Sequence, residues 1–265
     1  MLLAIDAGNT NTVIGIYDGP ELLRPWRVAT NVERTSDEFA LLITQFLSMH
    51  EIDFDEHIKG VAISSGVPRV TAALREMTTR YAPEANLVVL EPGTKSGMPI
   101  LYENPREVGA DRVANAVGAY DLYGGPTIVV DFGTANTIEA ISAAGEYLGG
   151  AIFPGIEISL DALFARAAAL RRVELVEPRN VIGRTTVESI QSGAIYGFVA
   201  QTDGLVHRFL DELGEATVVA TGGLSGPIVR LSETIQHHEP WLTLPGLRII
   251  YDRNADASRA SQDLR

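Results

Sequence analysis

The stretch that decides the fold is LLAIDAGNTNT at residues 2–12, and a second copy, TIVVDFGTANT, occupies residues 127–137. Sliding the chain by 125 positions places Asp6 on Asp131 and Gly8 on Gly133 without a gap. Each copy has the pattern of an apolar strand that closes on an aspartate, a Gly/Asn/Thr loop and a second strand. The repeat predicts two similar lobes that arose by duplication, and a ligand cleft between them.

The chain outside the repeat alternates between strand and helix patterns, which indicates an α/β fold. Further strands are expected at 60–65, 87–90, 146–153, 217–221 and 247–251, and helices at 39–47, 70–77, 107–123, 160–170 and 185–213. The break at Gly124-Gly125-Pro126 divides an N-terminal lobe, residues 1–122, from a C-terminal lobe, residues 123–254. Residues 255–265 are expected to form a flexible tail.

Composition excludes several classes of protein. The chain has 265 residues, a formal net charge of −13 and no cysteine. The absence of cysteine excludes disulfides, thiolate metal sites and cysteine nucleophiles, and the acidic balance argues against binding to nucleic acid or anionic membranes. The start of the chain lacks a signal peptide pattern, so a cytoplasmic location is expected.

The loop that begins at Asp6 has the chemistry of a phosphate turn. Glycine permits a tight turn and close approach of the backbone to a ligand, and successive N–H groups in such a turn form an anion-binding concavity. A carboxylate would repel a phosphate directly, so Asp6 is expected to hold a cation or its water shell. Asp131, Gly133 and Thr134 would face the same phosphate chain from the other lobe. The alternative is a plain hairpin turn, because these residue types are also common turn formers.

Two further segments carry candidate side chains. Gly222 and Gly223 follow an expected strand, where a flat base or ribose could lie on the backbone; a simple strand-to-helix turn is the alternative. Asp111 begins a helix, where an acidic residue is favoured by the helix dipole whatever its function. In a cleft Asp111 could accept the proton of an alcohol that attacks a phosphate, and Arg112 would suit a substrate carboxylate.

Other signatures of phosphate, metal or acyl chemistry are missing. Thr94-Lys95-Ser96 lacks the glycine that a P-loop needs before its lysine, and no nucleophile elbow is present. The adjacent residues His237 and His238 cannot easily face one metal ion and are expected in a solvated loop.

The ordered set of motifs resembles the type III pantothenate kinases of the actin/hexokinase/heat-shock-ATPase superfamily. The resemblance covers nearly the whole chain. It is carried by residues 6–11, 97–99, 102–105, 107–112, 131–135, 148–155, 186–193 and 220–224. It implies two ribonuclease-H-like lobes with mixed sheets, flanking helices and a cleft between them. The implied reaction is phosphorylation of pantothenate by ATP to 4′-phosphopantothenate, the first step of coenzyme A synthesis.

The resemblance also implies roles for individual residues. Asp111 matches the general base. Contacts to ATP match Asp6, Ala7, Gly8, Asn9, Thr10, Asn11, Thr12, Val13, Thr134, Gly222 and Gly223. Contacts to pantothenate match Tyr102, Gly109, Ala110, Asp111, Arg112 and Thr186. Asp131 matches a ligand of the K⁺ or NH₄⁺ ion that the family uses, and Asp6 the residue facing Mg²⁺–ATP. The family is a homodimer, so Thr186 is expected to serve the partner's site.

Two positions depart from the family pattern. The family often has threonine and aspartate where this chain has Asn136 and Glu139, which puts the geometry of the metal site in question. Two rival functions stay open at this point. One is a kinase of the same superfamily that acts on another small alcohol, although a neutral sugar would not need Arg112. The other is a nucleotide-binding regulatory protein without turnover.

Overall fold

The computed structural model describes residues 1–167 and 170–262, and the chain divides into two compact units. Unit 1 contains Met1–Pro99, Glu103–Gly118 and the chain from Leu242 onward, and unit 2 contains Ile100–Tyr102 and Ala119–Trp241. The chain therefore leaves unit 1 inside a helix and returns to it near the end. The expected boundary at 122/123 and the assignment of residues 242–254 to the second lobe are both wrong.

Unit 1 is built on a mixed five-stranded sheet in the order β3-β2-β1-β4-β5. The strands are β1 (Leu2–Ala7), β2 (Asn11–Asp18), β3 (Glu21–Ala29), β4 (Gly60–Ser65) and β5 (Asn86–Val89). The first three strands form an antiparallel meander, whereas β4 lies parallel to β1 and β5 parallel to β4. A parallel neighbour brings the carboxyl ends of β1 and β4 to the same edge.

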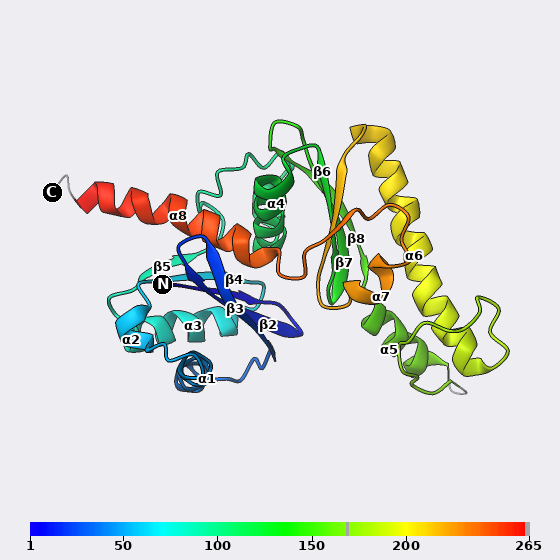
Figure 1. Ribbon diagram of the computed structural model, residues 1–265, viewed down its shortest axis with the longest axis horizontal. Coiled ribbons are helices and arrows are strands. Elements are labelled where there is room, and N and C mark those ends of the chain that lie inside the picture. Colours follow the sequence, from blue (N-terminus) through cyan, green and yellow to red (C-terminus); the bar gives the residue numbers. More distant parts are fainter. Residues whose placement is uncertain (168–169, 263–265) are drawn as a thin grey trace. The chain divides into compact units, whose positions relative to one another are not determined.

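One face of this sheet is covered by α1 (Ser36–Ser48), α2 (Phe54–His57) and α3 (Pro68–Tyr81), which lie below it in Figure 1. The helix α1 begins at the capping box that the sequence predicts, since the Thr35 side chain accepts from Glu38 N and Glu38 accepts from Thr35 N. Phe39, Ile43 and Leu47 recur at helical spacing and pack on the strands. The period of the apolar residues thus fixed this helix correctly.

The end of the chain is helical, and the expected strand at 247–251 is wrong. The helix α8 (Thr243–Gln262) crosses the other face of the unit 1 sheet, as Figure 1 shows in red. Leu244, Leu247 and Ile250 are almost fully buried and recur every three residues, which is the spacing of a helical stripe. Packing on the sheet therefore overrides the strand propensity of the β-branched residues. The expected tail, residues 255–265, is helical as far as Gln262; residues 263–265 lie outside the described residues.

The packing of α8 explains two glycines. At Gly60 an added Cβ would lie 2.2 Å from the Tyr251 hydroxyl, and at Gly97 it would lie 1.2 Å from Arg253 Nη1. Arg253 donates to the Ser96 carbonyl at 2.8 Å, and Asn254 exchanges hydrogen bonds with the backbone of Lys95. The helix is thus fastened to the segment that carries the Gly97–Pro99 motif.

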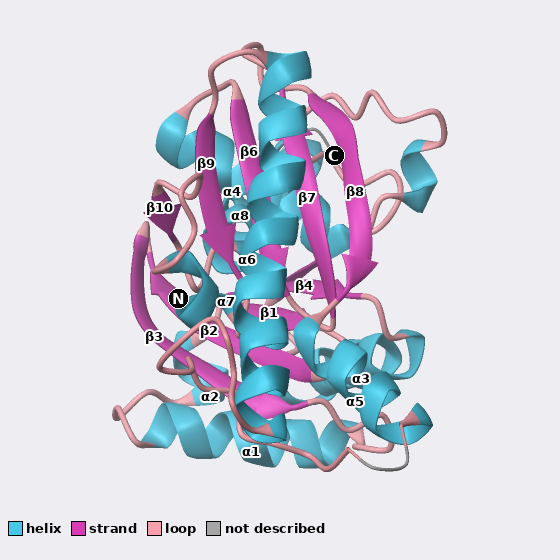
Figure 2. Cartoon of the chain, turned by 90° about the vertical axis from the view of Figure 1, so that its right-hand side faces the viewer, coloured by secondary structure: helices cyan, strands magenta, loops and turns pink. Residues whose placement is uncertain are grey.

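Unit 2 repeats the plan with a sheet in the order β10-β9-β6-β7-β8. Its strands are β6 (Thr127–Phe132), β7 (Ala135–Ile141), β8 (Tyr147–Pro154), β9 (Thr217–Thr221) and β10 (His237–His238). The helices α5 (Ile156–Arg166), α6 (Thr186–Leu213) and α7 (Ser225–Val229) cover one face around Phe132, Ile138 and Val206. Figure 2 shows α6 running along this sheet. The expected helix at 160–170 starts earlier, after Gly155, and ends at Arg166; residues 168–169 lie outside the described residues.

The remaining helices are η1 (Pro105–Glu107) and α4 (Ala110–Tyr123), within which the chain passes from unit 1 to unit 2. No helix in the described ranges combines the length and the apolar character that crossing a bilayer requires.

The two copies agree in topology, but not in every register. The third strands keep the offset of 125, because Leu22 of β3 and Tyr147 of β8, which are 125 positions apart, occupy equivalent places opposite Tyr17 and Ile141. In contrast, Ala7 pairs with Thr12 whereas Phe132 pairs with Asn136, so the second strands match at an offset of 124. The alignment without a gap is therefore wrong over β2 and β7. The structural counterpart of Thr12 is Asn136, and both residues are fully buried.

Candidate active site

The first candidate phosphate turn joins β1 to β2 in unit 1. Asp6 is the penultimate residue of β1 and pairs in register with Ser64 of the parallel strand β4, and its side chain is half exposed. The Ser64 hydroxyl is fully buried and has no hydrogen-bond partner among the described residues. A carboxylate and an uncommitted hydroxyl beside it are oxygen donors of the kind that face a hydrated Mg²⁺ ion.

The backbone of this turn is closed from within. Gly8 N donates to the Asn11 carbonyl at 3.0 Å, and the carbonyls of Gly8 and Thr10 accept from the side chain and the backbone N–H of Thr30, at 2.7 and 2.9 Å. The side chains of Asn9, Thr10 and Asn11 are exposed, whereas those of Ala7 and Thr12 are fully buried. Ala7 and Thr12 can therefore meet a ligand only through their backbone. Thr30 is a residue of this site that the sequence analysis missed.

The second candidate turn joins β6 to β7 in unit 2. Asp131 stands beside Thr221 of the parallel strand β9, as Asp6 stands beside Ser64. Gly222 follows with a φ of +94°, and an added Cβ there would lie 2.5 Å from both Asp131 Oδ1 and the Phe132 carbonyl oxygen. The absent side chain therefore lets the Gly222 backbone pass close to these two oxygens, of which the Phe132 carbonyl also accepts from Leu224 N at 3.2 Å. A carboxylate and a carbonyl oxygen are ligands of the kind that a monovalent cation can take.

The strand β8 ends beside the same turn. Gly155 N donates to the Thr134 carbonyl at 3.1 Å, and an added Cβ at Gly155 would lie 2.3 Å from the Thr134 oxygen and 2.4 Å from the Gly133 oxygen. The structure thus brings Asp131, Gly133, Thr134 and Gly222 together at one edge of the unit 2 sheet. Gly155 is a further part of this site, and its motif in the sequence was the available signal.

The turn at Gly222 is supported by a hydrogen-bonded chain. Ser225 Oγ donates to the Gly222 carbonyl at 2.7 Å and lies 2.7 Å from Nε2 of His238. Because the single hydroxyl proton is given to Gly222, His238 is the donor to Ser225. The histidine pair forms the exposed strand β10 rather than a loop. Beside it, His237 stacks on Tyr123, and burial together with a hydrogen bond to Glu239 raises the pKa of the Tyr123 hydroxyl to about 12.

The segment Gly109–Arg112 opens α4 on the unit 1 side. Asp111 is exposed, and its Oδ1 accepts from Arg112 N at 2.8 Å. An added Cβ at Gly109 would lie 2.4 Å from the same oxygen, which explains the glycine. Ala110 is half buried, and the side chain of Arg112 is buried. The Asp111 carboxylate thus lies at the solvent-exposed start of α4, and its hydrogen bond from the Arg112 backbone N–H fixes its orientation.

Tyr102 belongs to unit 2, where its ring packs edge-on against Tyr147 at 6.4 Å and over Gly149. The Tyr147 hydroxyl donates to Glu139, and both residues are fully buried. Glu139 lies two residues along β7 from Thr137, the residue that pairs with Asp131. This position explains the longer acid in part: the extra methylene carries the carboxylate to the Tyr147 hydroxyl. The other departure, Asn136, is buried opposite Phe132 and has no side-chain partner among the described residues.

Thr186 is the exposed first residue of α6, preceded by the N-cap Thr185. The 28 residues of α6 span about 42 Å, whereas the five residues of β9 span about 17 Å. Since the C-terminal end of α6 leads directly into β9, its N-terminal end lies well beyond the edge that carries Asp131. Within unit 2 the structure therefore separates Thr186 from Asp131, Thr134 and Gly222.

The duplicated aspartate turns on two similar mixed sheets define the class as a two-lobed kinase or ATPase of the actin and hexokinase type. A solved activator of 2-hydroxyisocaproyl-CoA dehydratase from Clostridium difficile with bound ADPNP has a similar fold. Its TM-score is 0.56 at 10% identity, over 98% of this chain and 97% of that one.

The sequence profile of the type III pantothenate kinases matches residues 2–208, and the chain belongs to this family. A type III pantothenate kinase of Moorella thermoacetica is 55% identical over 255 residues, which cover 96% of this chain and all of that protein. One of Streptomyces griseus is 52% identical over 261 residues, covering 96% of this chain and 98% of that protein.

The geometry at Gly222 gives a first test. Replacing Gly222 by alanine should cost about 2 kcal/mol or more of unfolding free energy, because the residue has a positive φ and its Cβ would meet Asp131 and Phe132. The same change should weaken the stabilisation that MgADP gives in thermal unfolding. Gly226→Ala is the matched control, since an added Cβ there meets nothing within 4 Å. Equal behaviour of the two variants would contradict this account of the turn.

Proposed function

We propose that the protein transfers the γ-phosphoryl group of ATP to the hydroxyl of pantothenate and so forms 4′-phosphopantothenate for coenzyme A synthesis. The observation that carries the proposal is the pair of aspartate turns in a chain of the type III pantothenate kinase family. Phosphoryl transfer needs mainly positioning and neutralisation of charge, which such turns can supply through backbone N–H groups and bound cations.

In this proposal Asp111 accepts the proton of the pantothenate hydroxyl as the new bond to phosphorus forms. Its carboxylate is exposed at the start of α4 and is oriented by the Arg112 backbone N–H. Gly109 and Ala110 contact pantothenate from the same segment, and Arg112 pairs with the carboxylate of pantothenate. Tyr102 and Thr186 complete the pantothenate contacts. A positioned base of this kind contributes about 10²–10⁴-fold to the rate.

The nucleotide lies on the two turns and on the glycine pair. Residues Asp6–Val13 contact the phosphates chiefly through the backbone, since Ala7 and Thr12 turn their side chains into the protein. Thr134 contacts the phosphates from unit 2, and Gly222-Gly223 carries the adenosine. Asp6 with Ser64 would hold the water shell of Mg²⁺, and Asp131 with the Phe132 carbonyl would hold K⁺ or NH₄⁺. When bound, these cations neutralise the phosphate charge that an acidic protein would otherwise repel.

The protein acts as a homodimer in the cytoplasm in this proposal. The end of unit 2 around α5 and the start of α6 exposes Ile158, Leu163, Val181, Val187 and Ile182, the last to 82%. Ser192 donates to the Val181 carbonyl, so this segment lies against α6 near Thr186. An exposed apolar surface of this kind favours a protein partner. In a homodimer the Thr186 of one copy would contact the pantothenate bound to the other copy, because Thr186 lies far from Asp131 within its own unit 2.

The direct test is release of ADP by the purified protein with MgATP and pantothenate, in potassium and in sodium buffer. We expect release that depends on pantothenate and is faster in potassium, because oxygen donors beside Asp131 suit the larger ion. Release without pantothenate, or only with another alcohol, would point to a different kinase. Nucleotide binding without any release would support the regulatory alternative.

Asp111→Asn should bind MgATP with unchanged affinity and lose about 10²–10⁴-fold in kcat, because the amide cannot accept the proton. Binding is measured by calorimetry and turnover by the ADP assay. Asp121→Asn is the control, an exposed aspartate on the same helix. Turnover of Asp111→Asn near that of the control would exclude Asp111 as the base.

The dimer is tested by the molar mass in solution, which light scattering should place at twice the 28.5 kDa of the chain. Ile182→Arg should shift this mass toward the monomer, because a charge would have to be buried in the interface. Leu41→Arg is the control, on an exposed apolar residue of α1 in unit 1. A wild-type protein that is monomeric at micromolar concentration would contradict the proposal.

A further inference from the structure

The two candidate phosphate turns are closed by the same position of the repeat. Thr30 is the first residue after β3, and Gly155, 125 positions later, is the first residue after β8. Thr30 N donates to the Thr10 carbonyl at 2.9 Å, and Gly155 N donates to the Thr134 carbonyl at 3.1 Å. The two bonds are equivalent, because β2 and β7 match at an offset of 124.

Beyond this shared bond, the two copies close the turn in different ways. In unit 1 the Thr30 hydroxyl donates to the Gly8 carbonyl at 2.7 Å and lies 2.9 Å from the Thr12 hydroxyl. Thr30 gives its one proton to Gly8, so Thr12 is the donor to Thr30. The proton of Thr12 is thus used inside the protein and is not available to a phosphate.

In unit 2 the turn is closed without hydroxyl groups, because the residue that corresponds to Thr30 has no side chain. The counterpart of Thr30 is Gly155, and the Gly133 and Thr134 carbonyl oxygens approach to within 2.4 Å of the place where its Cβ would be. The counterpart of Thr12 is Asn136, which is equally buried but has no hydroxyl to meet at position 155. One turn is therefore held by hydrogen bonds and the other by close packing of backbone on backbone.

The effect on a phosphate is the same in both turns. A carbonyl oxygen that faced the ligand would repel the phosphate, whereas an N–H group attracts it. In unit 1 the carbonyls of Gly8, Thr10 and Asn11 all accept bonds from within the unit. These oxygens are thereby directed into the protein before a ligand arrives.

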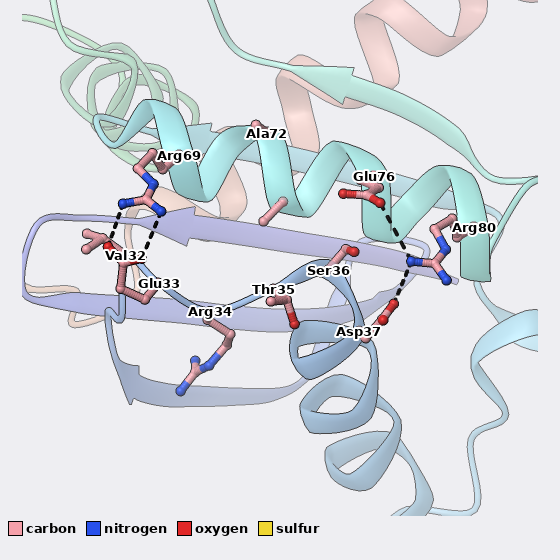
Figure 3. Close-up of a pocket in the computed structure, with 11 residues that line it drawn as sticks. Val32, Glu33, Arg34, Thr35, Ser36, Asp37, Arg69, Ala72, Glu76 and Arg80 are labelled. Atoms are coloured by element: carbon pink, nitrogen blue, oxygen red, sulfur yellow. Dashed lines mark hydrogen bonds and ion pairs between the residues drawn. The ribbon is translucent and has the colours of Figure 1, made fainter.

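The segment that carries Thr30 is itself anchored. Glu33 forms a two-point ion pair with Arg69 of α3, with contacts of 2.5 and 2.8 Å, and Arg80 pairs with Asp37 at 2.7 Å. Figure 3 shows these pairs across a groove of about 420 Å³ between residues 32–37 and α3. Two-point pairs of this kind fix orientation as well as distance. The segment that follows Thr30 thus contacts α3 through these exposed ion pairs and ends at the capping box of α1.

We propose that Thr30 and Gly155 are positioning residues for the nucleotide, each of which fixes the carbonyls of one phosphate turn away from the phosphates. This inference rests on the proposed binding of ATP to the two turns. It adds two residues that touch the turns and not the reacting atoms. Their loss should therefore weaken the binding of nucleotide and leave the binding of pantothenate largely unchanged.

The test is calorimetric binding of MgADP to the full chain, together with KM for ATP and for pantothenate. Thr30→Val removes the hydroxyl and keeps the shape and the N–H, and it should raise Kd for MgADP and KM for ATP about tenfold, since Gly8 and Thr12 lose their partner. KM for pantothenate should change less than about twofold. Thr30→Ser, which keeps the hydroxyl, should restore both nucleotide constants.

Thr71→Val is the matched control, because its hydroxyl also donates to a backbone carbonyl in unit 1, that of Val67 at 3.1 Å. Gly155→Ala should raise Kd for MgADP about tenfold or more, with Gly193→Ala, which has free space, as its control. If Gly155→Ala does not fold, the comparison of Thr30→Val with Thr30→Ser still tests the inference for the turn in unit 1.

Thr30→Val with lower thermal stability but wild-type nucleotide constants would overturn the inference and leave a purely structural role. The outcome is separable from the proposed function. A wild-type protein that binds MgADP but does not phosphorylate pantothenate defeats the kinase, while the binding constants of the variants still test Thr30 and Gly155.

Discussion

The parallel pairing of one strand with its neighbour is the constraint on which both candidate sites depend. An antiparallel meander alone would leave the end of β1 or β6 beside the start of the next strand. Because β4 lies parallel to β1 and β9 parallel to β6, the carboxyl ends meet, and each aspartate gains a hydroxyl neighbour. The pairs Asp6–Ser64 and Asp131–Thr221 follow directly from this topology.

The duplication conserves the plan of the turn but not the means of closing it. Unit 1 uses two hydroxyls and a carbonyl, and unit 2 uses a glycine that admits two carbonyl oxygens at close range. Both solutions satisfy the same demand, which is to turn backbone oxygens away from an anionic ligand. The difference also accounts for the threonine at position 12, which has a hydroxyl partner in Thr30, whereas the described residues do not explain the asparagine at position 136.

A hydrogen bond between two buried polar side chains supports the position of Tyr102 in unit 2. Glu139 and Tyr147 form a hydrogen bond in the interior of unit 2, next to the ring of Tyr102. A buried carboxylate needs such a partner, because an isolated charge in the interior is costly. The departure of Glu139 from the family pattern thus bears on the support of Tyr102.

The sequence by itself determined the duplicated aspartate turns, the α/β class, most helices and the family. These features are visible as local patterns, namely the spacing of apolar residues, the helix caps and the positions of glycines. The 52% identity to a type III pantothenate kinase over nearly the full length agrees with the family that these patterns indicate. Only the tertiary structure decided the one-residue shift of β2 against β7, because two compensating turns leave the flanking strands in register. It also decided that residues 243–262 form a helix, since burial of Leu244, Leu247 and Ile250 on a sheet outweighs local strand propensity. The roles of Thr30 and Gly155 depend on contacts between segments some 20 residues apart, which no local pattern contains.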